Sequence, residues 1–393
     1  MVELASYLFL VSLFLALVLT PLGARGARRW GILDHPGPRK IHLEPVPLSG
    51  GWALFGALTL VVWGHLGAAY LLRGVEPPGF LPDLGRKLLG QAPSLSLKIL
   101  PIWLGAAAIF VLGLLDDLRG VSARARLVVQ GLVAAALVAL GYGPSLTFFP
   151  PWAAGAIGVL WIVGVTNAFN FLDGLDGLAA GVAFVGTLAL LTIMGVSDQP
   201  NVVLLCAAWA GMLLGFLRYN AHPARVFLGS SGSLLVGYFM AMATLLLTFC
   251  AGPAKNPLAS VFTPLFVVAL PLYDTASVIL IRLREKRPLM TGDRSHFHHR
   301  LMRIGFSHRQ AVAFVCLMAF AVALSAVRLV YATPRGTAII LLQIGALLAV
   351  LVLAERVVMR ARGREKGQAR SGSAASGVFS VADARSEAWR KDR

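Results

Sequence analysis

Charged side chains are scarce in this chain of 393 residues, because Asp, Glu, Lys and Arg together make up only 13% of it. Soluble domains carry about twice that share, so the composition excludes an ordinary soluble domain. The three cysteines lie in apolar runs without metal-ligand spacing, which predicts small buried side chains. The chain also lacks a basic soluble module and a repeat of solenoid length. Nucleic-acid binding is therefore not expected.

Long apolar runs fill most of the chain, in which 57% of the residues are hydrophobic. Each run is close to the ~20 residues that a helix needs to cross a bilayer. We therefore predict an all-α, polytopic integral membrane protein with about eleven transmembrane helices. The first run lacks a basic start and a cleavage site, so we expect it to be retained. The predicted spans are 4–22, 51–72, 97–115, 124–142, 151–169, 177–196, 200–217, 233–251, 258–281, 311–331 and 336–355.

Basic residues are distributed unevenly between the segments that connect these spans. If the N-terminus lies outside, 28 of the 35 Lys and Arg fall on the inner side of the membrane. The positive-inside rule therefore predicts an outer N-terminus and a cytoplasmic C-terminus. The net charge of +17 then signals topology and attraction to anionic lipids. We expect one transmembrane domain, 1–359, and a basic, disordered cytoplasmic tail, 360–393, rich in Ser, Gly and Ala.

A dense group of polar residues borders the predicted fifth span, between Asn167 and Ala179. Asn167, Asn170, Asp173 and Asp176 recur every third residue. On an α-helix this spacing drifts by about 60° per step, so the four side chains do not form one stripe. We predict that a helix ends here and passes into a loop whose polar groups converge on a ligand. The alternative is a capped helix end followed by turn residues.

A pair of adjacent carboxylates, Asp116 and Asp117, closes the predicted third span, and three arginines follow it closely. Two neighbouring carboxylates do not both ionise cheaply at a membrane edge. A divalent cation, or the nearby Arg119, Arg124 and Arg126, would offset their charge. Asp pairs occur where Mg²⁺ meets a diphosphate, because hard cations take oxygen ligands. The alternative is a solvated start of a loop.

Histidines gather on the predicted inner side, where seven of the eight lie. The segment 293–300 places His296, His298 and His299 between Arg294 and Arg300. Arginine binds phosphate oxygens bidentately, whereas zinc usually takes carboxylate or Cys partners at defined spacing. The segment therefore favours a phosphate cradle over a metal site or a surface loop. Acids, imidazoles and guanidinium groups on one face indicate a membrane enzyme with a charged, soluble substrate.

The segment from Arg218 to Ser233 also lies on the predicted inner side. Gly229 and Gly232, with three serines, predict a tight turn rich in hydrogen-bonding groups, which suits a phosphate or a sugar. Phe227 offers an aromatic ring on which a base can stack. An ordinary turn between two helices is the alternative.

In this order, five motifs resemble those of the polyprenyl-phosphate N-acetylhexosamine-1-phosphate transferase family (glycosyltransferase family 4). They are most similar to its bacterial undecaprenyl-phosphate GlcNAc-1-phosphate transferase branch. The form DRxHxHHRL of the histidine motif favours this branch over the one that loads muramyl-pentapeptide phosphate. The motifs extend from about Asp34 to Ala311 and read DHPGPRKIHLEPVPLSGG, GLLDDLRGVSARARLVVQ, NAFNFLDGLDGLAAG, RYNAHPARVFLGSSGS and DRSHFHHRLMRIGFSHRQAV.

The resemblance implies the transfer of a sugar-1-phosphate, GlcNAc-1-phosphate, from a UDP-N-acetylhexosamine to undecaprenyl phosphate. Polyprenyl-diphosphate-sugar forms and UMP leaves, as the first step of a cell-envelope glycan. Such a reaction depends mainly on positioning and on neutralising charge. Mg²⁺ is the implied cofactor, with Mn²⁺ as the alternative ion. The implied partners are the UDP-sugar, undecaprenyl phosphate and the bilayer, and a homodimer is compatible with the family.

The resemblance also implies roles for individual residues. The catalytic set is Asp116, Asp117, Asp173 and His298. The metal set is Asp117, Asn170 and Ser230. The substrate-binding set is Asn167, Asp176, Phe227, Arg126, Arg294, His296, His299 and Arg300. Within it Phe227 would stack on uracil, and Arg126 would contact a phosphate.

One departure from the family pattern concerns the metal. The family usually has Gly-Asp-x-Gly-Ser where this chain has Gly229-Ser-Ser-Gly-Ser233, so Ser230 replaces an acidic ligand. A neutral hydroxyl holds Mg²⁺ less well than a carboxylate does. Two hypotheses follow: an active transferase in which other acids hold the metal, or an impaired homologue that binds UDP-sugar or polyprenyl phosphate without turnover. A transporter is disfavoured, because its charges would lie near mid-membrane.

Overall fold

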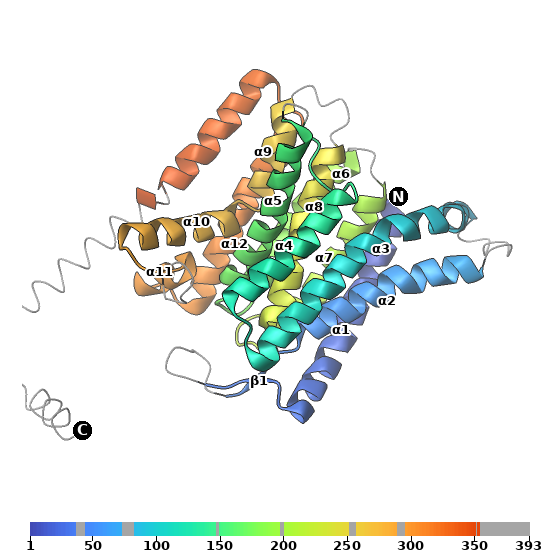
Figure 1. Cartoon of the computed structure of the whole chain (residues 1–393), viewed down its shortest axis with the longest axis horizontal. Helices are drawn as coiled ribbons and strands as arrows, with labels where there is room; N and C mark the ends of the chain where they lie inside the picture. Colours follow the sequence, from blue (N-terminus) through green and yellow to red (C-terminus); the bar gives the residue numbers. More distant parts are fainter. Residues whose placement is uncertain are drawn as a thin grey trace, which may run out of the picture.

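The chain folds into a bundle of long helices in the computed structural model (Figure 1). The structure describes residues 1–36, 44–72, 82–146, 149–196, 200–250, 257–288, 295–350 and 352–353. The predicted tail, 360–393, lies outside these residues, and so does Arg294. The elements are α1 (Val2–Trp30), β1 (Leu33–Asp34), β2 (Val46–Pro47), α2 (Gly50–Leu71), α3 (Pro82–Arg119), α4 (Ala123–Ala139), α5 (Pro151–Leu172), α6 (Leu178–Val196), α7 (Pro200–Asn220), α8 (Gly229–Cys250), α9 (Pro257–Val267), α10 (Ala269–Arg284), α11 (Phe297–Arg303) and α12 (His308–Leu329).

Eight helices among the described residues are long and apolar enough to cross a membrane. The bent pair of α9 and α10 makes a ninth when it is taken as one span. Two more predicted spans form helices of 17 residues, α4 and Pro334–Val350, which are shorter than a typical transmembrane helix. The all-helical, polytopic fold is therefore confirmed. The count of eleven and the orientation of the termini stay predictions.

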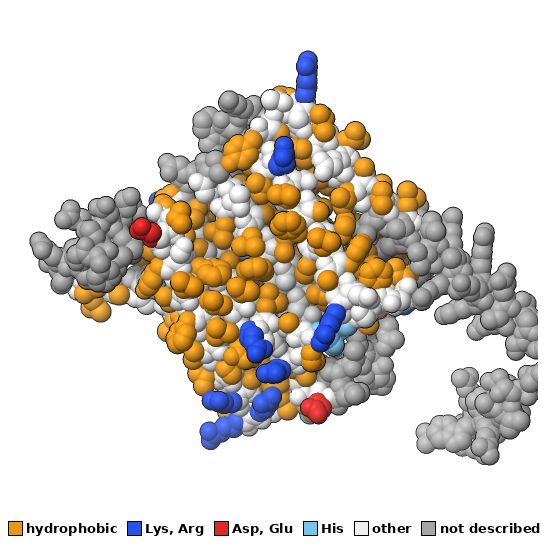
Figure 2. Space-filling view, turned by 180° about the vertical axis from the view of Figure 1, so that it is seen from behind, with side chains coloured by type: hydrophobic (Ala, Val, Ile, Leu, Met, Phe, Trp, Pro, Cys, Tyr) orange, Lys and Arg blue, Asp and Glu red, His pale blue; other side chains and the backbone are white. Residues whose placement is uncertain are grey.

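The outer surface of the bundle is mostly apolar. Figure 2 shows hydrophobic side chains across the visible face, with Lys and Arg gathered toward one end. That end is the one at which α1 finishes and β1 lies in Figure 1. Large apolar side chains such as Phe14, Leu132 and Leu160 are exposed on the outside of the bundle. Exposed apolar surface of this extent is typical of helices that face lipid.

Helix α8 occupies the centre of the bundle (Figure 1). Every residue from 231 to 245 is buried. A helix that is apolar on all sides has to be covered on all sides, and α2, α3, α5, α6 and α9 pack around it. The first turn of α8 thereby becomes the point at which several helix ends meet.

Glycines bring the first turn of α8 into backbone contact with two neighbouring helices. A Cβ atom on Gly51 of α2 would lie 2.5 Å from the Gly232 nitrogen. A Cβ atom on Gly113 of α3 would collide with the backbone of Ser231. Only residues without a side chain allow helices to approach this closely. Because Asp117 follows Gly113 by about one helical turn, this contact also places its carboxylate beside the start of α8.

The break between α9 and α10 redirects the chain at Val268. The two helices differ in direction by 79°, and α10 leaves the bundle sideways (Figure 1). Pro271 has no N–H to donate to the Val267 carbonyl, which explains why the helix does not continue. Sequence analysis predicted a single span, 258–281. In the structure the second half of this run belongs to α10, which carries Asp274 toward α11.

Candidate active site

A polar cavity of about 970 Å³ lies where the ends of the helices meet. All five sequence motifs contribute to its wall. Asp116 and Asp117 come from the end of α3, and Asn170, Asp173 and Asp176 come from the end of α5 and the loop after it. The remaining lining residues include Asp34, Glu44, Asn220, His222, Phe227, Ser230, Ser233, His299 and His308. The structure therefore brings together motifs that are far apart in the sequence.

Asp116 is held by the segment that follows α3. Its Oδ1 accepts a hydrogen bond of 2.8 Å from the Val121 N–H, and its Oδ2 accepts one of 2.6 Å from the Arg126 guanidinium. A charge-assisted contact of this length neutralises the carboxylate. Arg126 therefore supplies the positive charge that the Asp pair needs, and Arg126 itself is not among the cavity-lining residues.

Asp117 faces the first turn of α8. Its two carboxylate oxygens accept hydrogen bonds from the N–H groups of Ser230 at 2.6 Å and Ser231 at 3.0 Å. The first N–H groups of a helix have no partner inside the helix, and the helix dipole favours a negative charge there. Residue 230 thus serves Asp117 through its main chain, a contact that any residue type except proline would provide at this position.

Asp173 lies directly after the last residue of α5. Burial, together with the charges of Asp117 and Asp176, raises the pKa of Asp173 to about 8. Close by, the Oδ1 of Asn170 accepts a hydrogen bond of 2.8 Å from the Ser233 hydroxyl. Helix α5 thus ends where sequence analysis predicted, with its polar groups turned into a shared cavity.

The oxygen atoms around Asp117 and Asp173 fit a hard divalent cation. Asp117, Asp173, Asn170 and Ser230 all line it, and Mg²⁺ prefers oxygen ligands. The hydrogen bonds to Asp117 leave a second lone pair on each of its carboxylate oxygens. Burial and the charges of Asp117 and Asp176 raise the pKa of Asp173, and a bound cation would favour its ionised form. The donor set therefore suits Mg²⁺ although residue 230 is not acidic.

Asn167 lies away from the cavity, unlike the other polar residues of its segment. Its amide donates to the Gln130 side chain at 2.5 Å and to the Val163 carbonyl at 2.8 Å. Gln130 belongs to α4, so these contacts join α4 to α5. The structure places Asn167 between two helices, where it supports the helix that carries Asn170.

The histidine motif is anchored by Asp274, a fully buried residue of α10. His296 Nδ1 lies 2.9 Å from Asp274 Oδ2, and the Phe297 N–H donates to Asp274 Oδ1 at 2.6 Å. Phe297 is the first residue of α11, so this carboxylate caps the helix from outside. Arg300 donates to the Ser277 hydroxyl on the same helix α10 at 2.8 Å. The motif is thereby fixed to the bent arm of the molecule.

His298 is buried against the loop that follows α5. Its ring occupies the space that a side chain on Gly174 would fill. Neither ring nitrogen has a hydrogen-bond partner within the described part of the chain. Burial, followed by the neighbouring His299, lowers the pKa of His298 to about 3, so its imidazole is neutral. Among the three histidines of the motif, only His299 reaches the wall of the cavity.

Comparison with known proteins identifies the family of the chain. A sequence model described as glycosyl transferase family 4 matches residues 99–248. A protein of Bacillus subtilis strain 168, "Probable undecaprenyl-phosphate N-acetylglucosaminyl 1-phosphate transferase", is 36% identical over 335 residues, 83% of this chain and 85% of the relative.

The chain belongs to glycosyl transferase family 4.

Other relatives of this family 4 chain are distributed over distant bacteria. A Mycobacterium tuberculosis protein, "Decaprenyl-phosphate N-acetylglucosaminephosphotransferase", is 32% identical over 344 residues and 80% of each chain. A Yersinia pestis protein, "Undecaprenyl-phosphate alpha-N-acetylglucosaminyl 1-phosphate transferase", is 30% identical over 329 residues and 80% of each chain. The likeness thus covers most of the length of the family 4 chain.

Sequence reasoning missed Asn220, which organises two loops of the family 4 chain. Its Oδ1 accepts from the Gly177 N–H at 3.1 Å, and its Nδ2 donates to the Val226 carbonyl at 2.9 Å. Gly177 has a φ of +77°, a conformation that favours glycine. An asparagine at the very end of an apolar helix was the available signal. Next to it, the Phe227 main chain bonds to Pro47 and Gly50, which fixes Phe227 at the cavity wall.

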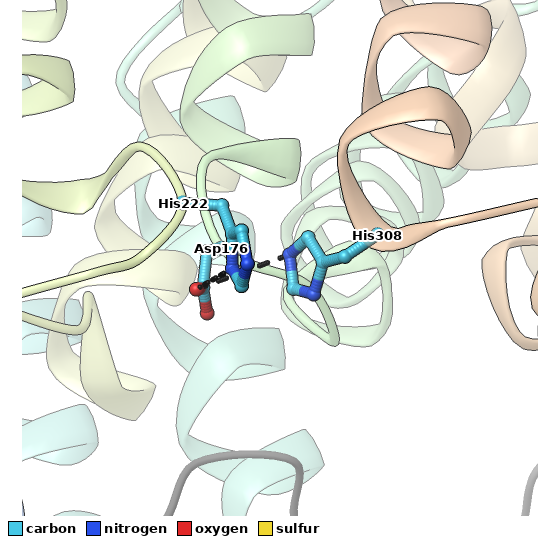
Figure 3. Close-up of side chains that lie close together, drawn as sticks. All are labelled: Asp176, His222 and His308. Carbon is cyan, nitrogen blue, oxygen red and sulfur yellow. Dashed lines mark hydrogen bonds and ion pairs between the residues drawn. The ribbon is translucent and has the colours of Figure 1, made fainter.

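Asp176 was predicted at the site, but its partners were not. Asp176 Oδ2 lies 2.7 Å from His222 Nδ1 and also accepts from the Ala224 N–H at 3.1 Å. His308, the first residue of α12, approaches from the other side (Figure 3). Sequence analysis placed both histidines on the inner side without assigning them a role. Asp274 was likewise missed, because it lies inside an apolar run.

Proposed function

We propose that this family 4 chain transfers GlcNAc-1-phosphate from UDP-GlcNAc to a polyprenyl phosphate such as undecaprenyl phosphate. The observation that carries this proposal is that five separate motifs line one polar cavity at the end of a helical bundle. The names of the relatives, which all refer to a polyprenyl phosphate and N-acetylglucosamine, support the same reaction. A soluble donor and a lipid acceptor can meet at such a position.

In the proposed reaction, an oxygen of the polyprenyl phosphate attacks the phosphorus that is bonded to the sugar. A new P–O bond joins the two phosphates, and the P–O bond to the nucleotide phosphate breaks. Polyprenyl-diphosphate-GlcNAc and UMP are the products. Phosphoryl transfer of this kind depends on positioning and on charge neutralisation, and the residues of the cavity supply both.

We assign the diphosphate to the end of the cavity at which Asp117 and Asp173 lie. Mg²⁺, or Mn²⁺ in its place, would be held there by Asp117, Asp173 and Asn170, and would offset the negative charge of the diphosphate. Asp116 is already neutralised by Arg126, so we assign it the role of fixing the loop after α3. This arrangement explains how the chain manages without an acid at residue 230.

We assign the nucleotide to the part of the cavity next to Phe227 and Asp176. Phe227 is held through its main chain, which leaves the ring to stack on a base. His299, with Arg300 behind it on α11, lies where the sugar phosphate would be held. The excess of basic residues on this side of the chain favours a cytoplasmic cavity in the bacterial inner membrane.

A transfer assay tests the proposal. Purified protein is given UDP-[¹⁴C]GlcNAc, undecaprenyl phosphate and Mg²⁺, and we expect labelled lipid and an equal amount of UMP. Asp173→Asn should abolish both products. Glu285→Gln is the matched control, because it also removes one carboxylate but lies exposed beside Arg287. The absence of product with every UDP-N-acetylhexosamine would refute the proposal.

The competing hypothesis, an impaired homologue that binds without turnover, is motivated by Ser230. The variant Ser230→Asp distinguishes the two. If the existing carboxylates hold the cation, the wild type is active and the new acid changes its rate little. A wild type without activity, together with a large gain in Ser230→Asp, would instead identify an impaired site.

A further inference from the structure

Three side chains that commonly bind metals meet at a second place in the cavity (Figure 3). Asp176 comes from the loop between α5 and α6, His222 from the loop between α7 and α8, and His308 from the start of α12. One ligand atom of each lies within 4.8 Å of those of the other two. We call these three residues the histidine–aspartate triad. The proposed reaction assigns no role to either of its histidines.

The spacing within the triad suits a small metal ion. His222 Nδ1 lies 2.7 Å from Asp176 Oδ2, and His308 Nε2 lies 3.9 Å from the same oxygen. In a tetrahedral zinc site, bonds of about 2.0–2.1 Å place neighbouring ligand atoms ~3.4 Å apart. The two observed distances lie on either side of that value. Small side-chain rotations would therefore bring all three atoms to one ion.

His308 gives a second, independent indication of a ligand. Its side chain is 9% exposed, and neither ring nitrogen has a hydrogen-bond partner within the described part of the chain. A buried polar group without a partner is costly, and such a group calls for an explanation. His308 stands next to Asp176 and its ring stacks on that of His222, with the centroids 4.1 Å apart. A metal ion at this point would satisfy the unpaired nitrogen.

The triad is held in place from outside. Ser307 and Gln310 form a capping box that fixes His308 at the first position of α12. The Ala224 N–H holds the Asp176 carboxylate, and Asn220 holds Gly177 in the same loop. Supporting contacts of this kind orient metal ligands and raise their affinity. The ligands therefore need little reorganisation to bind.

We propose that the histidine–aspartate triad binds one divalent transition-metal ion, such as Zn²⁺, separately from the Mg²⁺ assigned to Asp117 and Asp173. Two imidazoles and one carboxylate are ligands for Zn²⁺ and similar ions, whereas Mg²⁺ prefers oxygen alone. Because all three residues line the cavity, the fourth position of the ion opens into it. Water or a phosphate oxygen would occupy that position. The ion would also tie α12 to the loops that follow α5 and α7.

Isothermal titration calorimetry with Zn²⁺ alone tests this inference on the full, detergent-solubilised chain. The protein carries no histidine tag, is stripped of metal, and is kept in excess Mg²⁺ so that the carboxylates are occupied. We expect one Zn²⁺ per chain and a higher melting temperature in its presence. His308→Ala and His222→Ala should each weaken binding by at least ~10–100-fold, the loss that follows even when only an outer-shell partner of a metal ligand is removed.

Matched controls make the outcome decisive. His299→Ala removes another cavity histidine outside the triad and should leave the Zn²⁺ affinity unchanged. His222 is the more exposed histidine of the triad, so its variant should fold even if the His308 variant does not. Binding that survives His222→Ala, or that is lost in His299→Ala, would overturn the inference. A wild type that binds no Zn²⁺ would do the same. No sugar substrate is present, so a failed transfer assay would not affect this result.

Discussion

The two halves of the proposed active site stabilise their polar groups in opposite ways. At the carboxylate end (Asp116, Asp117 and Asp173), negative charge is met by an arginine and by the free N–H groups of α8. In the histidine motif (His296, His298, His299 and Arg300), one buried carboxylate, Asp274, fixes the backbone and His296. His298 stays neutral, with neither ring nitrogen bonded inside the described protein.

The two groups of residues also differ in the helices that support them. The carboxylate end rests on the most buried helix of the described bundle, α8, and its geometry depends on glycine contacts that leave no freedom. The histidine motif rests on the bent arm, α10, which packs against α5 and α12 more closely than against α8. We therefore expect changes at the carboxylate end to remove activity outright, and changes at the histidine motif to reduce it. The following predictions test that contrast.

The largest effect is expected for Asp117→Asn at the carboxylate end. The change removes one negative charge from the proposed cation site and leaves only one oxygen for the two N–H groups of α8. We expect the transfer rate to fall on the order of 10²–10³-fold, as for other groups that stabilise charge in a transition state. The rate of labelled lipid formation measures this. A rate within threefold of the wild type would place the charge-stabilising group elsewhere.

The next largest effect is expected for Gly113→Ala, which places a methyl group against the backbone of Ser231. Overpacking of this kind costs ~1–3 kcal/mol, and the displaced α3 should also reduce the transfer rate. Gly131→Ala in α4 is the control, because nothing lies within 4 Å of the new Cβ atom. Thermal melting in detergent compares the two variants. Equal melting temperatures would show that α3 and α8 do not need their close contact.

At the histidine motif, Asp274→Asn keeps the shape of the side chain and removes its charge. We expect a fall in kcat of roughly tenfold, because charge-assisted hydrogen bonds are about twice as strong as neutral ones. KM should change little, since Asp274 acts only by positioning His296 and α11. Thr275→Val is the control on the next residue, where the hydroxyl is buried without a partner. A pure loss of stability with kcat intact would assign Asp274 a structural role.

The last prediction concerns the pH dependence of stability and involves no change in the transfer rate. Because the pKa of His298 is about 3 when folded and 6.5 in its ordinary state, the unfolded chain binds more protons between these values. The contribution to stability is complete above pH 6.5 and is lost as the pH falls toward about 3, by at most about 1.4 kcal/mol per pH unit. Between pH 6.5 and about 3, the melting temperature of the wild type should therefore fall more steeply with falling pH than that of His298→Gln. An equal fall of the melting temperature in both proteins would contradict a neutral, buried His298.

Many of the residues that sequence analysis predicted for the site line one cavity in the structure. Asn170, Asp173 and Asp176 were placed at a helix end that turns into a loop, and α5 ends at Leu172 as expected. Such a prediction is local, because the residues lie within a few positions of one another and beside an apolar run. The joining of five motifs at one cavity was also foreseen, since the charge distribution put them on one side of the membrane.

Pairings across long distances in the chain were not foreseen. Asn167 was expected to contact substrate, yet it bonds to Gln130, 37 positions away. Asp274 was overlooked because it lies inside an apolar run. The break at Val268, which separates α10 from α9, depends on three-dimensional packing as well as on Pro271. No local pattern distinguishes a carboxylate that anchors another helix from one that faces water.

By itself, the sequence determined a polytopic helical protein, the family of its motifs and the carboxylates that gather at one end. Apolar length and charge distribution are properties of short segments, so a linear chain displays them. Only the tertiary structure decided that Asp117 faces α8, that Arg126 neutralises Asp116, and that Asp176 meets two histidines. The first of these depends on how closely α3 and α8 pack, and the glycine contact of Gly113 with Ser231 fixes that distance. The other two join side chains whose separation in the sequence says nothing of their distance in space.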